Sequence, residues 1–181
     1  MERPSLPRIS IAATARQALV AGSLASLLST GALAYAGRRQ NGSATAPINA
    51  VSHWYWADEA LHQQGADAAH TGAGYLTHHG AAVFWAGLFA CAARDRPPLR
   101  TPGGVVWGSL ATSALACFVD FRLTPKRLTP GFEHRLPRTV LAGVYAAFAV
   151  GLAAGALAVQ AHERRVGVQD RARARKPPAA P

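Results

Sequence analysis

Four long stretches of the chain contain no Asp, Glu, Lys or Arg, and they constrain the fold more than any other feature. They cover residues 17–37, 71–93, 101–119 and 139–161, which are 21, 23, 19 and 23 residues long. A helix needs about 20 apolar residues to cross the roughly 30 Å hydrocarbon core of a bilayer. A soluble helix of that length would turn a charged or polar face to water. The sequence therefore predicts an all-α, polytopic membrane protein, built as a four-helix transmembrane bundle.

The low share of charged residues supports a membrane protein, whereas the mean hydropathy leaves a soluble protein open as an alternative. Charged residues make up 15% of the chain, against about 25% in ordinary soluble domains. Two cysteines are too few for a disulfide scaffold. The mean hydropathy of +0.07 is low for a membrane protein, and it favours the alternative of a soluble bundle of Ala-rich helices. We expect one transmembrane domain over residues 17–161.

Basic segments flank that domain on both sides. Residues 1–16 are expected to form a basic cytoplasmic N-terminus. Residues 162–181 contain mainly Arg, Ala and Pro, so we expect a disordered tail. Its charge would attract anionic lipid headgroups, which makes membrane lipids the expected partners. No aromatic residues interleave with these arginines, so the tail does not indicate nucleic-acid binding.

The distribution of Lys and Arg predicts the orientation of the spans. Twelve of these residues fall in the two termini and the second connection, and seven fall in the first and third connections. Cytoplasmic loops carry the excess of positive charge, which predicts a multi-pass protein of the bacterial inner membrane with both termini cytoplasmic. An Ala-x-Ala sequence at residues 34–36 resembles a signal cleavage site. The pair Arg38 and Arg39 directly after it favours a retained span.

Small residues recur in the fourth charge-free stretch. Gly143, Ala147, Gly151 and Gly155 follow one another at intervals of four. Such a row lets helix backbones approach closely in lipid. We expect a helix-packing face here, either within the chain or between copies in a homo-oligomer.

Residues 47–63 are expected to form a short outer helix. Pro47 suits a first helical turn, and an aromatic cluster lies at residues 54–56. Trp and Tyr concentrate at headgroup depth. Two alternatives remain, a helix lying in the membrane interface and a helix packed on the bundle, and one helix can satisfy both.

Polar residues near the start of the second stretch form a candidate intramembrane site. Thr71, Tyr75 and His79 lie four residues apart, so they share one helix face, whereas His78 points about 100° away. The simplest interpretation is a hydrogen-bonded seam between helices. A second is a small transporter or ion-conducting subunit that uses Tyr75, His79 and Asp120. A third is a haem or metal site formed by His53, His78 and His79, although no motif of paired metal ligands is present.

The third connection mixes charge with apolar residues and indicates a structured loop. Two interpretations remain open: a loop packed on lipid headgroups, and a site that recognises an anionic lipid or a periplasmic solute. No nucleophile elbow, phosphate loop or paired metal motif indicates an enzyme. The candidate outer-face site consists of His53, Asp120, Arg122, Lys126, Arg127 and Glu133.

Three segments carry a resemblance to a known class of proteins. They are PINAVSHW at residues 47–54, HHGAAVFW at 78–85 and PKRLTPGFE at 125–133. In this order they resemble small, uncharacterised four-span inner-membrane proteins of Gram-negative bacteria. The resemblance implies placement in the membrane and supplies no mechanism. The function expected from the sequence is a structural or accessory role, without a cofactor, alone or beside a membrane complex.

Overall fold

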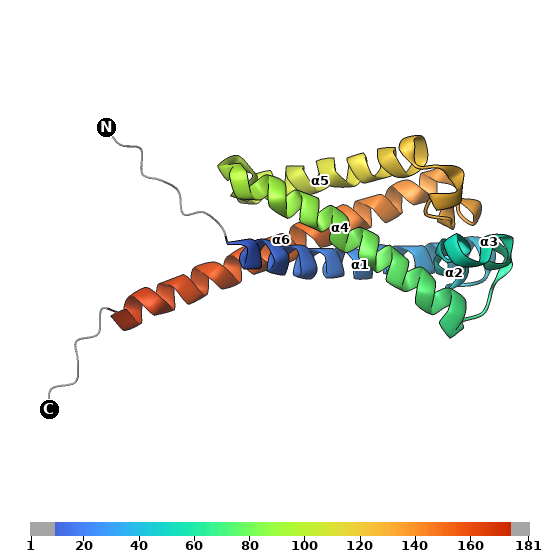
Figure 1. Cartoon of the computed structure of the whole chain (residues 1–181), viewed down its shortest axis with the longest axis horizontal. Coiled ribbons are helices and arrows are strands. Elements are labelled where there is room, and N and C mark those ends of the chain that lie inside the picture. The colour runs from blue at the N-terminus through green and yellow to red at the C-terminus, as the bar shows by residue number, and fades with distance from the viewer. Residues whose placement is uncertain (1–9, 175–181) are drawn as a thin grey trace, which may run out of the picture.

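The structure, a computed structural model, describes residues 10–174, with side chains placed as far as residue 170. Within this range every regular element is a helix (Figure 1). The elements in chain order are α1 (Ile11–Asn41), α2 (Ala46–Val51), α3 (His53–His62), η1 (Ala68–Gly72), α4 (Ala73–Asp95), η2 (Pro97–Arg100), α5 (Pro102–Phe118), η3 (Val119–Leu123), η4 (Lys126–Leu128), η5 (Phe132–His134) and α6 (Arg138–Ala174).

Four helical segments have the length and apolar composition of membrane spans. They are Ile11–Asn41, Ala68–Asp95, Pro102–Leu123 and Arg138–Asp170, with mean hydropathies of 1.5, 1.2, 1.5 and 2.0. Their outward faces carry large apolar side chains, such as Leu27, Phe84 and Trp107, which are 56%, 60% and 74% exposed. An apolar outer surface is what a bilayer requires. The predicted all-α bundle of four spans is confirmed, and the chain is a multi-pass membrane protein.

Helix α1 extends beyond its charge-free stretch at both ends, where Ser10 and Gly42 cap it. Ser10 accepts a hydrogen bond of 3.2 Å from the amide of Ala13, which begins α1 six residues before the predicted span. Gly42, with φ of 73°, ends the same helix in the left-handed conformation. The charged residues at these ends lie in helix rather than in loops.

The prediction of a disordered tail from residue 162 is wrong for its first part, because α6 continues to Ala174. Arg, Ala, Gln and Glu are good helix formers, and adding residues to a helix that packing has already nucleated costs little. This extension runs past the other helices (Figure 1). Residues 175–181 lie outside the described part of the chain.

The connections place the loops at two ends of the bundle. The start of α1, the η2 turn and the far half of α6 lie at one end, which we call the terminal end (Figure 1). The first connection (residues 42–67) and the third connection (residues 124–137) meet at the other end, which we call the loop end. Six histidines belong to the loop-end connections and to the first turns of the helix that follows the first connection: His53, His62, His70, His78, His79 and His134.

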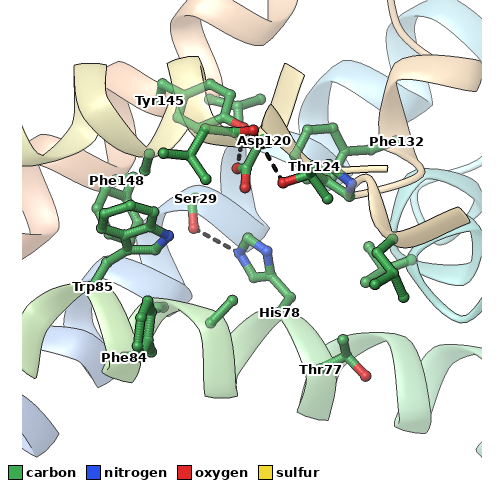
Figure 2. A pocket seen from close by; sticks show the side chains of 18 of the residues that line it. Ser29, Thr77, His78, Phe84, Trp85, Asp120, Thr124, Phe132, Tyr145 and Phe148 are labelled. Carbon is green, nitrogen blue, oxygen red and sulfur yellow. Dashed lines mark hydrogen bonds between the residues drawn. The ribbon is translucent and has the colours of Figure 1, made fainter. Parts of the chain in front are cut away.

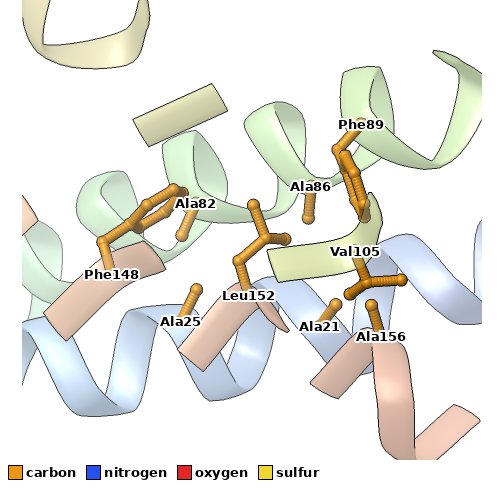
Figure 3. Close-up of a cluster of buried hydrophobic side chains, with 9 residues drawn as sticks. All are labelled: Ala21, Ala25, Ala82, Ala86, Phe89, Val105, Phe148, Leu152 and Ala156. Carbon is orange, nitrogen blue, oxygen red and sulfur yellow. The ribbon is translucent and has the colours of Figure 1, made fainter. Parts of the chain in front are cut away.

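Helix α1 packs between α4 and α6 and forms the centre of the bundle. Its Ala21 and Ala25 are fully buried against Leu152 and Ala156 of α6 and Ala82 of α4 (Figure 3). Small side chains on α1 let both neighbours approach closely, which stabilises packing in lipid through van der Waals contact. The first span is therefore an integral part of the core.

The predicted packing face of α6 is only half used. A Cβ at Gly151 would lie 2.5 Å from the Cα of Ala25, and one at Gly155 would lie 2.5 Å from the Cα of Ala21. Gly143 instead faces open space, and Ala147 is half-buried. Four residues advance a helix by about 400°, so a row at this spacing turns by about 40° per step. Toward the N-terminal end of α6, the row of small residues therefore turns away from α1.

The predicted outer helix over residues 47–63 is instead two short helices. α2 is buried along its whole length, and α3 follows it after Ser52. A Cβ at Gly74 of α4 would lie 2.1 Å from the carbonyl oxygen of Ile48, so only glycine allows α2 to lie this close to α4. Of the two alternatives, α2 is the helix packed on the bundle, whereas Tyr55 and Trp56 of α3 are exposed.

Candidate functional site

A cavity of about 300 Å³ lies in the loop-end half of the bundle, and we call it the crevice. Its walls come from α4, from the ends of α5 and α6 that face the loops, and from the third connection (Figure 2). Most of its lining is apolar, including Phe84, Trp85, Phe132 and Phe148. Ligand pockets typically measure about 300–1,000 Å³ and combine an apolar lining with a few polar groups. The crevice is at the small end of that range.

The crevice exists because α4 and α5 separate. Both helices pack closely on other neighbours, α4 on α1 and α5 on α6, but they make few contacts with each other. α4 ends and α5 begins at the η2 turn, where the two helices are close, and they diverge toward the loop end (Figure 1). Two lining residues are widely exposed, Phe84 at 60% and Leu128 at 45%. The crevice therefore opens at the surface of the bundle on the side where lipid would lie.

Two polar pairs face each other across the crevice (Figure 2). Nε2 of His78 lies 2.8 Å from the hydroxyl of Ser29 on α1. The hydroxyl of Tyr145 on α6 donates to the carboxylate of Asp120 at 2.6 Å. Ionisable groups at membrane depth are costly, and they usually mark a functional site or an internal pair. His78 and Asp120 each have one such partner on a neighbouring helix, and both still line the crevice.

Ser29 also hydrogen-bonds the backbone of its own helix, to the carbonyl oxygen of Ala25 at 2.8 Å. A hydroxyl has a single proton, so a serine that donates to this carbonyl accepts a hydrogen bond from His78. The imidazole then carries its proton on Nε2, and Nδ1 is left as an acceptor. The crevice thus offers one imidazole acceptor and one carboxylate on opposite walls.

The predicted seam of Thr71, Tyr75 and His79 is divided in the structure. Tyr75 and His79 lie together, with ring centroids 5.7 Å apart, and Tyr75 packs against the loop-end core around Leu33 and Ile48. Neither residue lines the crevice. The histidine that shares a cavity with Asp120 is His78, so the path predicted through Tyr75, His79 and Asp120 needs correction. The 100° between adjacent helix positions accounts for the division.

Thr71 belongs to a network that closes the first connection. Its hydroxyl donates to the side chain of Asn49 at 2.6 Å and accepts from the amide of Asp67 at 3.1 Å. The carboxylate of Asp67 accepts from the amide of His70 at 2.6 Å and from the side chain of Gln63 at 2.5 Å. These hydrogen bonds, the backbone one first, lower the pKa of Asp67 below its usual range. The network anchors the loop beside α2.

A second pocket lies at the loop end, and we call it the cationic pocket. Four of the six predicted outer-face residues line it: His53, Lys126, Arg127 and Glu133. Asp120 turns into the crevice instead, and Arg122 lines a neighbouring hollow. The cationic pocket and the crevice share two lining residues, Trp54 and Thr124. The two spaces are therefore adjacent, and the cationic pocket differs from the crevice in the charged side chains among its lining residues.

The structure does not bring together the three histidines of the predicted metal or haem site. Nδ1 of His53 lies 2.8 Å from the carbonyl oxygen of Ala50, whereas His78 faces the crevice and His79 stacks on Tyr75. Over residues 10–170 no group of three His, Cys, Asp or Glu side chains could hold a metal ion. The metal interpretation of these residues is therefore wrong in its geometry.

Ser29, Tyr145 and Trp54 are among the crevice residues that the sequence did not assign to a site. Ser29 and Tyr145 carry hydroxyl groups inside charge-free spans, where a polar group needs a partner, and this signal could have drawn attention to them. Their partners His78 and Asp120 depend on how the helices are arranged. Trp54 donates from its indole to the carbonyl oxygen of Thr129 at 3.0 Å, a contact that no local pattern predicts.

The three segments that carry the sequence resemblance converge on the crevice. Residues 47–54 contribute Trp54, residues 78–85 contribute His78 and Trp85, and residues 125–133 contribute Leu128 and Phe132. This convergence comes from the fold, since the segments are far apart in the chain. No protein-family model matches the chain, and no curated protein or solved structure is similar to it.

Proposed function

We propose that this protein is an accessory protein of the bacterial inner membrane that holds one lipid chain in its crevice. The observation that carries the proposal is an apolar cavity that opens toward lipid between α4 and α5, in the half of the bundle next to the loops. The structural or accessory role expected from the sequence becomes a specific one, which is lipid binding. The protein has both termini in the cytoplasm in this proposal.

The orientation is supported by the division of positive charge between the two ends. In the sequence, twelve Lys and Arg residues fall in the two termini and the second connection, and seven fall in the first and third connections. The excess of positive charge favours a cytoplasmic terminal end. The crevice then lies in the outer half of the membrane.

The shape and chemistry of the crevice support an acyl chain as the occupant. Its aromatic and aliphatic lining suits a chain without polar groups, and the exposed Phe84 and Leu128 mark an entrance at the surface of the bundle. A lipid can enter from the bilayer sideways, without crossing water. The hydrogen bonds of the two polar pairs hold His78 and Asp120 against the walls, and the rest of the lining offers contacts to an apolar chain.

A transport function has less support. Asp120 and His78 share the crevice, as a carrier would require, but each is held by a partner on a neighbouring helix. No hollow described at the terminal end continues the crevice across the bundle. Lipid binding needs only the opening that is present.

Mass spectrometry of the intact protein, released gently from detergent, tests the proposal. We expect one phospholipid to remain bound to the wild type. Ala81 lines the crevice and is exposed, so Ala81→Trp should fill the space and reduce the lipid-bound fraction about tenfold, which corresponds to about 1.4 kcal/mol. Ala146→Trp is the matched control, because Ala146 is exposed on α6 and lines no described pocket. Equal lipid retention in both variants would reject the proposal.

A further inference from the structure

We infer that the cationic pocket binds the headgroup of an anionic phospholipid whose acyl chain lies in the crevice. The inference rests on the proposed function and adds the chemical class of the lipid. Its starting point is that an apolar space and a cationic space adjoin each other at Trp54 and Thr124. A phospholipid has the same division into an apolar chain and a charged head.

The cations of the pocket are available for a ligand. Lys126, Arg127 and Arg138 line it. Among the described residues none of the three forms an ion pair with a carboxylate. Their side chains also donate no hydrogen bond to the protein within that part of the chain. Arg135 differs, because its guanidinium donates to the carbonyl oxygen of Leu61 at 2.7 Å and stabilises the loop.

The position of two of these cations connects them to the crevice. Lys126 and Arg127 belong to the short helix η4. Thr124, two residues before the pair, and Leu128, directly after it, both line the crevice. Thr124 is fixed by a hydrogen bond of 3.0 Å from its hydroxyl to the carbonyl oxygen of Val119. The charged pair therefore lies at the rim of the apolar space, where the head of a bound lipid would be.

The carboxylates of the pocket do not cancel this charge. Glu133 lies 3.8 Å from His134, and Asp58 is exposed on α3. Three permanent cations thus oppose two carboxylates among the lining residues, and one of the carboxylates has a basic neighbour of its own. A phosphate that adds negative charge at η4 finds complementary charge there. Guanidinium and ammonium groups are the usual partners of phosphate oxygens.

Trp54 gives the pocket a fixed wall at the boundary between the two spaces. Its indole is oriented by the hydrogen bond to Thr129, so the ring is held between α3 and the third connection. Tryptophan rings favour the depth at which acyl chains meet headgroups. This places the boundary of the bound lipid at the same level as that of the surrounding bilayer.

A lipid titration in detergent tests the inference. Purified protein is titrated with phosphatidylglycerol and with phosphatidylcholine of the same chains, and bound lipid is counted by mass spectrometry of the intact protein. We expect tighter binding of phosphatidylglycerol, and Lys126→Gln with Arg127→Gln should weaken it about tenfold. Arg38→Gln with Arg39→Gln is the matched control, since it removes two cations at the loop end that lie outside the cationic pocket. The control should leave the preference unchanged.

The outcomes separate the inference from the proposed function. Binding of neither lipid would reject both. Equal binding of the two lipids, with loss in Ala81→Trp, would keep the proposed function and overturn the headgroup inference. A preference removed equally by the Arg38 and Arg39 changes would also overturn it, because general surface charge would then be the cause.

Two further measurements use only the wild-type protein, so misfolding of a variant cannot explain their results. Raising the salt concentration on the wild type should weaken phosphatidylglycerol binding and leave phosphatidylcholine binding unchanged. Inorganic phosphate alone should not displace the bound lipid at millimolar concentration. Displacement by phosphate would mean that the pocket takes a soluble anion, and the inference would be wrong.

Discussion

The hydroxyl of Tyr145 in α6 donates a hydrogen bond of 2.6 Å to the carboxylate of Asp120 in η3. This bond joins the two helices at the wall of the crevice, and the hydroxyl of Ser113 adds a second link to the carbonyl oxygen of Tyr145 at 2.7 Å. Asp120 lies within a candidate membrane span, where an unpaired carboxylate would be costly. The crevice keeps its shape because this pair fixes the wall opposite α4.

Replacing Tyr145 by Phe should destabilise the protein, because Asp120 loses its partner. Hydrogen bonds between helices in membranes contribute about 0.6 kcal/mol on average, and those to charged groups contribute more. We expect a loss of about 1–2 kcal/mol in the free energy of unfolding. Unfolding in detergent, followed by circular dichroism, measures it.

A double-mutant cycle with Asp120→Asn separates this bond from other effects of the substitution. The two single changes should not add, because the second removes a partner already lost. Tyr35→Phe is the control, since Tyr35 is 71% exposed on α1. Strict additivity at positions 120 and 145, or equal destabilisation at position 35, would contradict the role given to the pair.

Gly151→Leu should disrupt the packing of α6 on α1. A Cβ at this position would lie 2.5 Å from the Cα of Ala25, so the two helix backbones must separate. Overpacking of this kind costs about 1–3 kcal/mol. Gly143→Leu provides the control on the same helix, because nothing lies within 4 Å of its added Cβ. Similar unfolding temperatures for the two variants would show that the row of small residues has no packing role.

Stability should fall at acid pH as Asp67 is protonated. Its pKa is lowered in the folded protein by the amide of His70 first, and by the side chains of Gln63 and His70. A carboxyl with a lowered pKa stabilises the folded state fully above its unfolded pKa of about 3.9. That contribution is lost as the pH falls through the lower, folded value.

Unfolding temperatures between about pH 5 and pH 2 measure this contribution. Asp67→Asn should flatten the acid limb of the profile. Asp58→Asn should not, because the side chain of Asp58 makes no hydrogen bond within the described residues. The network around Asp67 would have no stabilising role if both variants followed the wild-type curve.

Reporter fusions test the orientation. An alkaline phosphatase domain should be active when inserted at residues 41–46 and inactive after Pro181, because the enzyme requires the periplasm. A fluorescent protein that folds only in the cytoplasm should give the opposite result. Reversed signals at both positions would place the loop end in the cytoplasm, and with it the crevice in the inner leaflet.

The fold could be predicted from the sequence because its main signal is local. Four charge-free stretches of the length of a bilayer specify four spans without knowledge of their neighbours. The ends of the helices and the break between α2 and α3 could not be predicted this way. They depend on caps such as Ser10 and on the close approach of Ile48 to Gly74, which only the packed bundle creates.

The candidate site could be predicted only in part. The spacing of Tyr75 and His79 correctly indicated that they share a face, and the residue types of the third connection indicated a charged site. The choice of His78 rather than His79 as the neighbour of Asp120 depends on the rotation of α4 about its axis. That rotation is set by contacts such as Gly22 against Val83, where an added Cβ would lie 2.6 Å from the Cα of Val83.

Photo-crosslinking from inside the crevice tests the central claim most directly. Trp85, which lines the crevice, and Trp107, which is 74% exposed on α5, are each replaced by a benzophenone amino acid of similar size. The protein is extracted, washed extensively with detergent and then irradiated. We expect a covalent phospholipid adduct at position 85 and none at position 107, because only a lipid held in the crevice survives the wash. No adduct at position 85, or equal adducts at both positions, would contradict a lipid-binding crevice.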